Sequence, residues 1–269
     1  MSSCYEFKDI KFDKGLFDDS VDITYIITCC GNNPDRIKHV IEQLNKFHPT
    51  KHVRVLFNKG FKNCHKDLEK PTSEYDLRDA LMHVFSDARK YNRILVLEDD
   101  FEIDDIINKP RHIHNITKFL DNNDPHVYGL GSVLELINPL YLLATNQNII
   151  FMTASHAVFY NKEYRTDLLE QYNDPKKRKR LPRHIDIIWM NPKYSKYVYY
   201  RPLIYQKLSC TDNMQTWPLN KIVNWCHILS SVGADVDAKR TFIILKCISY
   251  LVCVLLILLA GKIMISYIK

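Results

Sequence analysis

The stretch from residue 21 to residue 97 alternates between two hydrophobic patterns, and this alternation limits the possible folds more than any other feature of the sequence. Short runs of β-branched and aliphatic residues have the pattern of strands buried on both faces. Between them, apolar residues recur at helical spacing. Strand, helix, strand, helix, strand predicts an α/β domain whose parallel sheet has helices on both faces. The predicted strands are 21–30, 52–58 and 93–97. One predicted helix begins at Pro34, and the other covers 74–91.

The second half of the chain is less regular, and it extends the sheet into a mixed one. We expect a single domain over 21–230, with an N-terminal extension over 1–20 and a linker over 231–240. Further strands are predicted at 126–132, 140–145, 148–161 and 196–206, with helices near 162–173 and 184–190.

Residues 241–261, "TFIILKCISYLVCVLLILLAG", form an apolar run with one charge, Lys246. At 1.5 Å per residue such a helix spans roughly 30 Å, which matches the hydrocarbon core of a bilayer. We therefore predict a transmembrane helix over 241–265, with the Lys246 amine reaching the headgroups; a buried core helix is the alternative. The N-terminus has no apolar core like that of a signal peptide, so we expect a tail-anchored, single-pass membrane protein with its body facing the cytosol.

Composition excludes some classes of function. The formal net charge is only +6, and five positive charges lie in one run, "KKRKR" (176–180), so no nucleic-acid partner is expected. This run is either a solvated loop or a mobile loop that contacts a diphosphate, an anionic acceptor or lipid headgroups. The chain has 7 glycines and neither glycine-rich phosphate-binding motif. Its eight cysteines include no CxxC pair, which predicts free thiols in a reducing compartment.

Three consecutive carboxylates follow the predicted strand 93–97, in "ILVLEDD". One interpretation is a solvated acidic turn. The other is a cation site, because ligands of open α/β sheets bind beyond the carboxyl ends of the strands. If the segment is extended, Glu98 and Asp100 share one face and can hold Mn²⁺ or Mg²⁺ together with phosphate oxygens. Asp99 then faces away, where it shapes the turn or reaches a ribose.

Several segments of the chain follow one another in an order that is informative. They are "YIITCCGNNPDRIKHVIEQL" with Arg36, the helix with His83, "ILVLEDDFEI", "MTASHAVFYNKEY" with Ser155 and His156, "LPRHIDIIWM" with Asp186, and "YYRPLIYQKLSCTDN" with Pro202, Gln206 and Ser209. Together these segments resemble the nucleotide-sugar-binding core of family 25 glycosyltransferases, which includes lipopolysaccharide sugar transferases and procollagen galactosyltransferases and has the GT-A fold. The chain departs from the family's pattern in the helix before the triplet, where Met82 stands in place of serine and the usual glycine is absent.

The resemblance implies a GT-A-like, Rossmann-related mixed sheet and a hexosyltransferase that moves a sugar from a nucleotide sugar, in particular a UDP-sugar, to a protein or glycan acceptor with inversion. An inverting displacement needs a base opposite the diphosphate, and Asp186 in the apolar "HIDIIWM" is the candidate; its alternative role is a helix N-cap. His156 is either a third metal ligand beside Glu98 and Asp100 or a core histidine. The donor-binding candidates are Arg36, His83, Glu98, Asp99 and Gln206.

Two other functions remain open. One is a non-catalytic, membrane-anchored binding or scaffold protein that keeps the glycosyltransferase fold, which the altered helix around Met82 favours. The other is a nucleotidyltransferase, because sheets of this type with metal-binding carboxylates also serve that chemistry.

Overall fold

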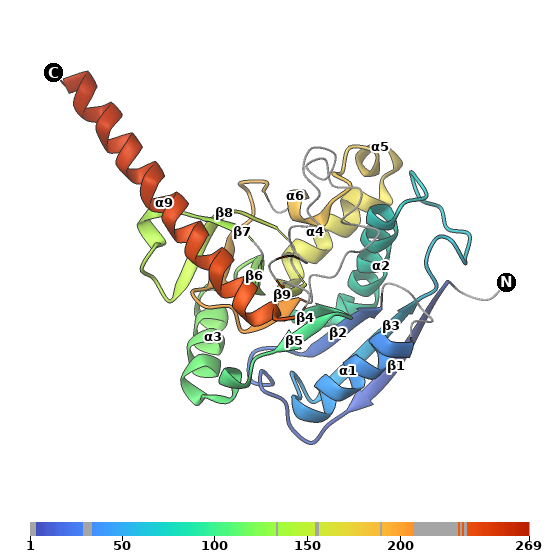
Figure 1. The fold of residues 1–269 in the computed structure, drawn as a ribbon. Coiled ribbons are helices and arrows are strands. Elements are labelled where there is room, and N and C mark those ends of the chain that lie inside the picture. The colour runs from blue at the N-terminus through green and yellow to red at the C-terminus, as the bar shows by residue number, and fades with distance from the viewer. Residues whose placement is uncertain are drawn as a thin grey trace.

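The computed structural model is a mixed α/β domain with a long C-terminal helix that projects from it (Figure 1). The structure describes residues 4–28, 34–132, 134–153, 156–188, 190–206, 231, 233 and 236–268; for residues 134, 185, 186 and 264–268 it describes the backbone alone.

A nine-stranded sheet forms the centre of the domain, in the order β1-β3-β2-β4-β9-β6-β10-β8-β7. Strands β3, β2 and β4 are parallel, whereas β1, β9, β8 and β7 run antiparallel to their neighbours. A second, two-stranded sheet pairs β5 with β11. The strands are β1 (Tyr5–Lys11), β2 (Ile23–Thr28), β3 (His52–Asn58), β4 (Arg93–Glu98), β5 (Phe101–Ile103), β6 (Val127–Gly131), β7 (Leu134–Ile137), β8 (Asn146–Thr153), β9 (Ala157–Asn161), β10 (Lys196–Tyr199) and β11 (Ile204–Gln206).

Helices cover both faces of the sheet, as the buried strands require. Alternate side chains of β4 enter two different cores: Ile94 and Val96 pack with α2 and α4, while Leu95 and Leu97 pack with α1 and α3. Figure 1 shows α2 and α4 on one side of the sheet and α1 on the other. The helices are α1 (Pro34–Lys46), α2 (Ser73–Asp87), α3 (Pro110–Asn123), α4 (Lys162–Asn173), α5 (Pro175–Arg178), α6 (Ile185–Ile188) and α9 (Ala238–Ile268), with 3₁₀ turns η1 (Ala88–Lys90), η2 (Asp105–Asn108) and η3 (Pro139–Tyr141).

Three predicted strands are corrected by the structure. The run 140–145 is the end of η3 and a turn. The run 148–161 is divided between β8 and β9, which pair with different neighbours. The run 196–206 is divided between β10 in the large sheet and β11 in the small one, with Pro202 between them, whose missing N–H disfavours a continuous ladder. The sheet also begins before residue 21, because β1 pairs along the whole of β3.

The C-terminal helix differs from a simple tail. α9 is long and apolar enough to cross a membrane, as its composition predicts. However, α9 packs against β7, β11 and η3, so part of the helix belongs to the folded domain. Lys246 was expected to extend toward headgroups; instead it is buried and pairs with Glu135.

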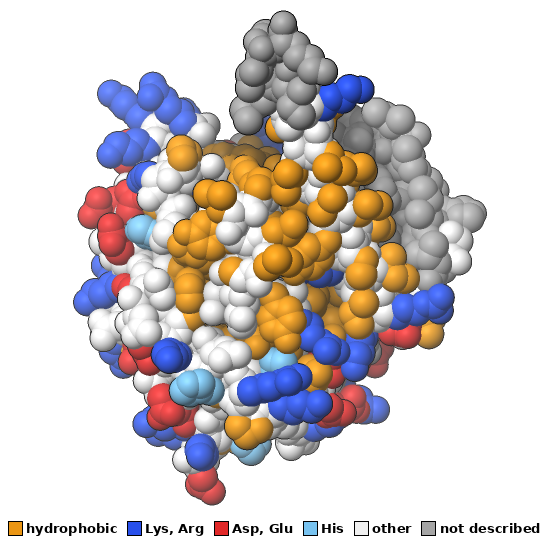
Figure 2. Space-filling view, turned by 90° about the vertical axis from the view of Figure 1, so that its left-hand side faces the viewer, with side chains coloured by type: hydrophobic (Ala, Val, Ile, Leu, Met, Phe, Trp, Pro, Cys, Tyr) orange, Lys and Arg blue, Asp and Glu red, His pale blue; other side chains and the backbone are white. Residues whose placement is uncertain are grey.

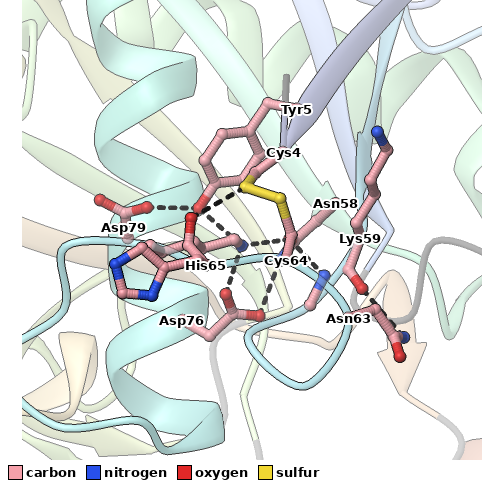
Figure 3. The surroundings of a disulfide bond; sticks show 11 residues. Cys4, Tyr5, Asn58, Lys59, Asn63, Cys64, His65, Asp76 and Asp79 are labelled. Carbon is pink, nitrogen blue, oxygen red and sulfur yellow. Dashed lines mark hydrogen bonds and ion pairs between the residues drawn. A yellow bond between two sulfur atoms is a disulfide. The ribbon is translucent and has the colours of Figure 1, made fainter. Parts of the chain in front are cut away.

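Cys4 and Cys64 form a disulfide, which corrects the expectation that the cysteines are free thiols (Figure 3). The bond joins the start of β1 to the segment that follows β3. Among the cysteines that the structure describes, Cys247 and Cys253 are free.

Candidate functional site

The acidic triplet lies where β4 ends, beside the first turn of α1. Because β2 and β4 are parallel neighbours, the start of α1 after β2 and the triplet after β4 reach the same edge of the sheet, as predicted. The strand ends at Glu98, and residues 99 and 100 form a turn before β5. The extended geometry assumed from the sequence is therefore wrong for Asp99 and Asp100, and side-chain alternation does not decide where they point.

Arg36 connects α1 to this turn. Its guanidinium forms an ion pair with Asp99, which is 1% exposed, and its Nη1 lies 3.8 Å from Asp100 Oδ2. Asp99 thus faces Arg36 of α1, on the side where Asp100 also lies. Asp100 is also buried and accepts hydrogen bonds from Gln206 Nε2 at 3.2 and 3.3 Å. Burial raises the pKa of Asp100, while the positive charge of Arg36 and the Gln206 hydrogen bond oppose that rise.

Two further residues of α1 contact β5. A ring nitrogen of His39 donates to the Phe101 carbonyl at 2.6 Å, and Gln43 Oε1 accepts from the Ile103 backbone N–H at 3.0 Å. With Arg36 these residues lie at i, i+3 and i+7, one face of the helix. Sequence reasoning missed His39 and Gln43, although their spacing from Arg36 was a visible signal. The same turn of chain is thereby held at three points.

Glu98 ends β4, and His156 directly precedes the neighbouring strand β9. Glu98 is half-buried, and its backbone N–H donates to the His156 carbonyl at 2.9 Å. His156 is 1% exposed, its Nε2 donates to the Ile204 carbonyl at 2.9 Å, and its ring packs edge-on against Phe242 of α9. Since Nε2 is engaged by a carbonyl, any metal bond from His156 would have to use Nδ1. Within the described ranges, no group of three His, Cys, Asp or Glu side chains lies close enough to hold a metal.

His83 belongs to a different cluster, at the carboxyl end of β3. Its ring packs on Tyr5 at a centroid distance of 4.1 Å. The Tyr5 hydroxyl donates to Asp79, and the buried Lys66 amine contacts Tyr5, Asn58 and Asp76 (Figure 3). Burial, helped by Lys66, lowers the pKa of His83 although Asp79 opposes this, so the ring is neutral at pH 7. The nearby Cys4–Cys64 bond fixes the segment that carries Lys66.

A hollow of about 280 Å³ lies between α4 and the segment from α5 to residue 194. Lys177 and Arg180 of the basic run line it, together with Ile187 and Ile188 of α6. Asp186 is in the same turn of helix, but its side chain lies outside the described part of the chain, as do Ser155 and Ser209. The structure therefore brings together Arg36, Asp99, Asp100 and Gln206. The role of Asp186 as a base or as a helix N-cap stays a prediction, because its side chain is not among those described.

A scan against protein-family models gave no match, and a search of curated proteins gave none. Some solved structures are distantly similar. A mannose-1-phosphate geranyltransferase from Thermus thermophilus is 11% identical over 66% of this chain and 73% of its own, with a TM-score of 0.40. A putative glucose-1-phosphate thymidylyltransferase from Bacillus anthracis is 12% identical over 68% and 89%, with a TM-score of 0.39. A glycosyltransferase involved in glycosylation of the major capsid of PBCV-1 is 12% identical over 72% and 96%, with a TM-score of 0.38.

Proposed function

We propose that the domain is a metal-dependent glycosyltransferase of GT-A-like fold that takes a nucleotide sugar, in particular a UDP-sugar, as donor. One observation carries the proposal: Arg36, Asp99, Asp100 and Gln206 meet at the carboxyl edge of the parallel strands. Open α/β sheets bind nucleotides at this edge. The order of sequence segments that resembles family 25 supports the same assignment.

The residues at this edge fit a divalent cation. Carboxylate oxygens are the ligands that Mg²⁺ and Mn²⁺ prefer, and Mg²⁺ keeps few protein ligands, so Asp100 can hold the ion together with phosphate oxygens. Glu98 joins as the second protein ligand in this proposal by turning toward Asp100, because the turn at residues 99 and 100 removes the shared face of an extended chain. The Gln206 hydrogen bonds hold the Asp100 carboxylate in one orientation. Bound there, Mn²⁺ or Mg²⁺ would neutralise the charge that grows on a departing diphosphate. A role for His156 as a third ligand remains a prediction.

Other residues bind and orient the substrates in this proposal. Arg36 is half-buried beside the carboxylates and can exchange its Asp99 contact for a donor phosphate. Asp99 then becomes available to a ribose hydroxyl, and His83 contacts the donor from the β3 side. Asp186 acts as the base for an acceptor hydroxyl. The hollow beside α6, with Lys177 and Arg180 at its wall, receives a protein or glycan acceptor.

The second candidate is a non-catalytic, membrane-anchored binding or scaffold protein. Two observations favour it. The positive charge of Arg36 compensates the buried Asp99 carboxylate, and His83 is packed on Tyr5 beside the Lys66 cluster. A protein that keeps the fold for binding alone would retain both contacts and lack turnover.

Manganese-dependent hydrolysis of nucleotide sugars by the full-length protein, assayed in detergent against a panel of UDP- and GDP-sugars, tests the proposal. We expect Asp100→Asn to lower turnover more than about a hundredfold, because metal-assisted charge stabilisation supplies several kcal/mol to the transition state. Asp105→Asn is the matched control, since Asp105 lies five residues further on with its side chain 69% exposed. Binding without turnover would contradict the transferase, and absence of binding to any nucleotide sugar with manganese present would favour the scaffold decisively.

A further inference from the structure

The first half of α9 has its polarity reversed relative to a helix on the surface of a water-soluble domain. The side chains that face the body include a lysine and a serine, Lys246 and Ser249, both under 10% exposed. After the first turn, where Lys239 and Arg240 are exposed, the outward-facing side chains are uncharged and, apart from Cys247, aliphatic. A surface helix in water shows the opposite arrangement, with its apolar stripe inward and its charges outward. The exposed aliphatic residues of this half are Ile243, Ile244, Ile248, Leu251 and Val252.

The inward polar groups join α9 firmly to the edge of the sheet. Lys246 forms an ion pair with Glu135 of β7, and its Nζ also donates to Gln147 Oε1 at 2.9 Å. Ser249 Oγ accepts from the Glu135 backbone N–H at 3.2 Å, and Cys253 Sγ contacts the Ile137 carbonyl. Because β7 is the last strand of the sheet, these contacts satisfy backbone groups that an edge strand leaves unpaired. The helix and the domain therefore move as one unit.

The part of α9 outside the domain is too short to cross a bilayer alone. Residues 254–261 lie between Cys253, the last residue of α9 that is buried among those the structure describes, and the next charge, Lys262. They rise ~12 Å, against a hydrocarbon core of ~30 Å. If α9 enters lipid, turns of the helix that are packed on β7 must enter with it. The Lys246–Glu135 pair makes this feasible, because a compensated charge is far less costly at low dielectric than an isolated one.

A second element presents aliphatic side chains on the same side. In the segment 138–145, which contains η3, Leu140 is 90% and Leu143 is 97% exposed. Gln147 holds this segment to α9, because its Nε2 donates to the Leu142 carbonyl at 2.7 Å and contacts the Tyr250 hydroxyl at 2.6 Å. Figure 2 shows the result: hydrophobic side chains form a broad area on this face of the molecule, and charged side chains lie around its margin.

We propose that α9 and the segment 138–145 together form one rigid lipid-binding face, so that the domain lies against the bilayer and does not hang from a flexible tether. The occupant is lipid and not a second copy of the chain because the exposed aliphatic side chains of α9 continue on successive residues from Val254 to Leu259, which fits a surrounding solvent better than one partner. Basic residues, Lys239 and Arg240 before the apolar stretch and Lys262 within its end, suit phosphate headgroups.

Photocrosslinking of the full-length protein in vesicles of phosphatidylcholine and phosphatidylserine tests this face. Benzoylphenylalanine is placed at one of three positions: Leu143, Ile257 in the projecting part of α9, or Lys11 on β1 at the opposite edge of the sheet. We expect lipid adducts at comparable yield from positions 143 and 257, and only background from position 11. Mass spectrometry identifies each adduct.

Three results would overturn the proposal. Lipid adducts at 257 without adducts at 143 would show a tethered domain held away from the bilayer. Crosslinks from 143 to another copy of the chain would show a protein interface. Background yield at both 143 and 257 would show that α9 does not enter lipid. None of these results depends on transferase activity, so this face and the proposed function stand or fall separately.

Discussion

Gly131 permits the close approach of β11 to the end of β6, which positions Gln206 beside Asp100. A Cβ built on Gly131 would lie 1.9 Å from the Ile204 carbonyl oxygen and 3.2 Å from His156 Nε2. We predict that Gly131→Ala displaces β11, weakens the His156–Ile204 hydrogen bond and destabilises the protein by about 1–3 kcal/mol or more, as overpacking against backbone does. Urea unfolding measures the loss.

A matched control lies two residues earlier on the same strand. A Cβ on Gly129 would meet the Val198 Cγ1 methyl at 3.2 Å, a side-chain atom that can shift slightly. Gly129→Ala should therefore lower the free energy of unfolding clearly less than Gly131→Ala, and it should leave the proposed metal-dependent nucleotide-sugar binding unchanged. Equal losses of stability in the two variants would show that the approach of β11 is not the constraint.

At the scale of elements, Asp104 connects α9 to the segment that follows β5. Its carboxylate accepts from the Tyr205 hydroxyl at 2.7 Å and pairs with Lys239 in the first turn of α9 at 3.1 Å. Burial alone would raise the pKa of Asp104, but the hydrogen bonds from Tyr205 and the Ile106 backbone, together with Lys239, outweigh it and lower the pKa. The stabilisation is therefore present above the unfolded-state pKa, near 3.8, and is lost as pH falls through the lower folded-state pKa.

This linkage predicts a measurable pH dependence. We expect the free energy of unfolding to fall as pH drops below about 5 and on through the lowered folded-state pKa of Asp104, and the fall to be smaller in Asp104→Asn, which is already less stable at pH 7. Other carboxylates titrate in the same range, so the quantity to compare is the difference between the two proteins at each pH. An unchanged pH profile in Asp104→Asn would contradict a role for this carboxylate in holding α9.

The elements that sequence predicts well are those with a strong local period. β2, β3, β4, α2 and α4 each bury a regular stripe or run, so their patterns survive without knowledge of the partners. β1 was missed because it is an edge strand that pairs only with β3, and because polar residues interrupt its apolar ones. α3 was missed although its signals were visible: Pro110 stands at its first position, and Ile113, Ile116 and Leu120 recur at helical spacing.

The candidate site was predictable only in part, for the same reason. That Arg36 and the triplet share one edge followed from the parallel order of β2 and β4. The partner of His156 did not, because the Ile204 carbonyl is 48 residues away and the chain between them changes sheets. The turn after Glu98 was also invisible to a pattern rule that assumes an extended chain.

At the scale of the whole molecule, the Cys4–Cys64 bond bears on which side of the membrane the body occupies. Structural disulfides persist in oxidising compartments and are rare in the cytosol. The bond closes a long loop, with a sequence separation of 60 residues, so by the chain-entropy model it contributes about 4 kcal/mol to stability. The expectation of a cytosolic body rested on the N-terminal sequence and on scattered cysteines, and the disulfide now opposes the second of these arguments.

We therefore predict that the body lies on the oxidising side of its membrane. In sealed vesicles prepared from cells that make the full-length protein, the body should resist added protease until detergent is present. Alkylation without reductant should leave Cys4 and Cys64 unmodified, while Cys247, which is exposed, serves as a described free thiol for comparison once detergent is added. Digestion of the body in intact vesicles, with Cys4 and Cys64 alkylated, would restore the cytosolic placement. Because α9 is fixed to β7 through Lys246 and Glu135, this result would also decide which leaflet contacts the segment 138–145.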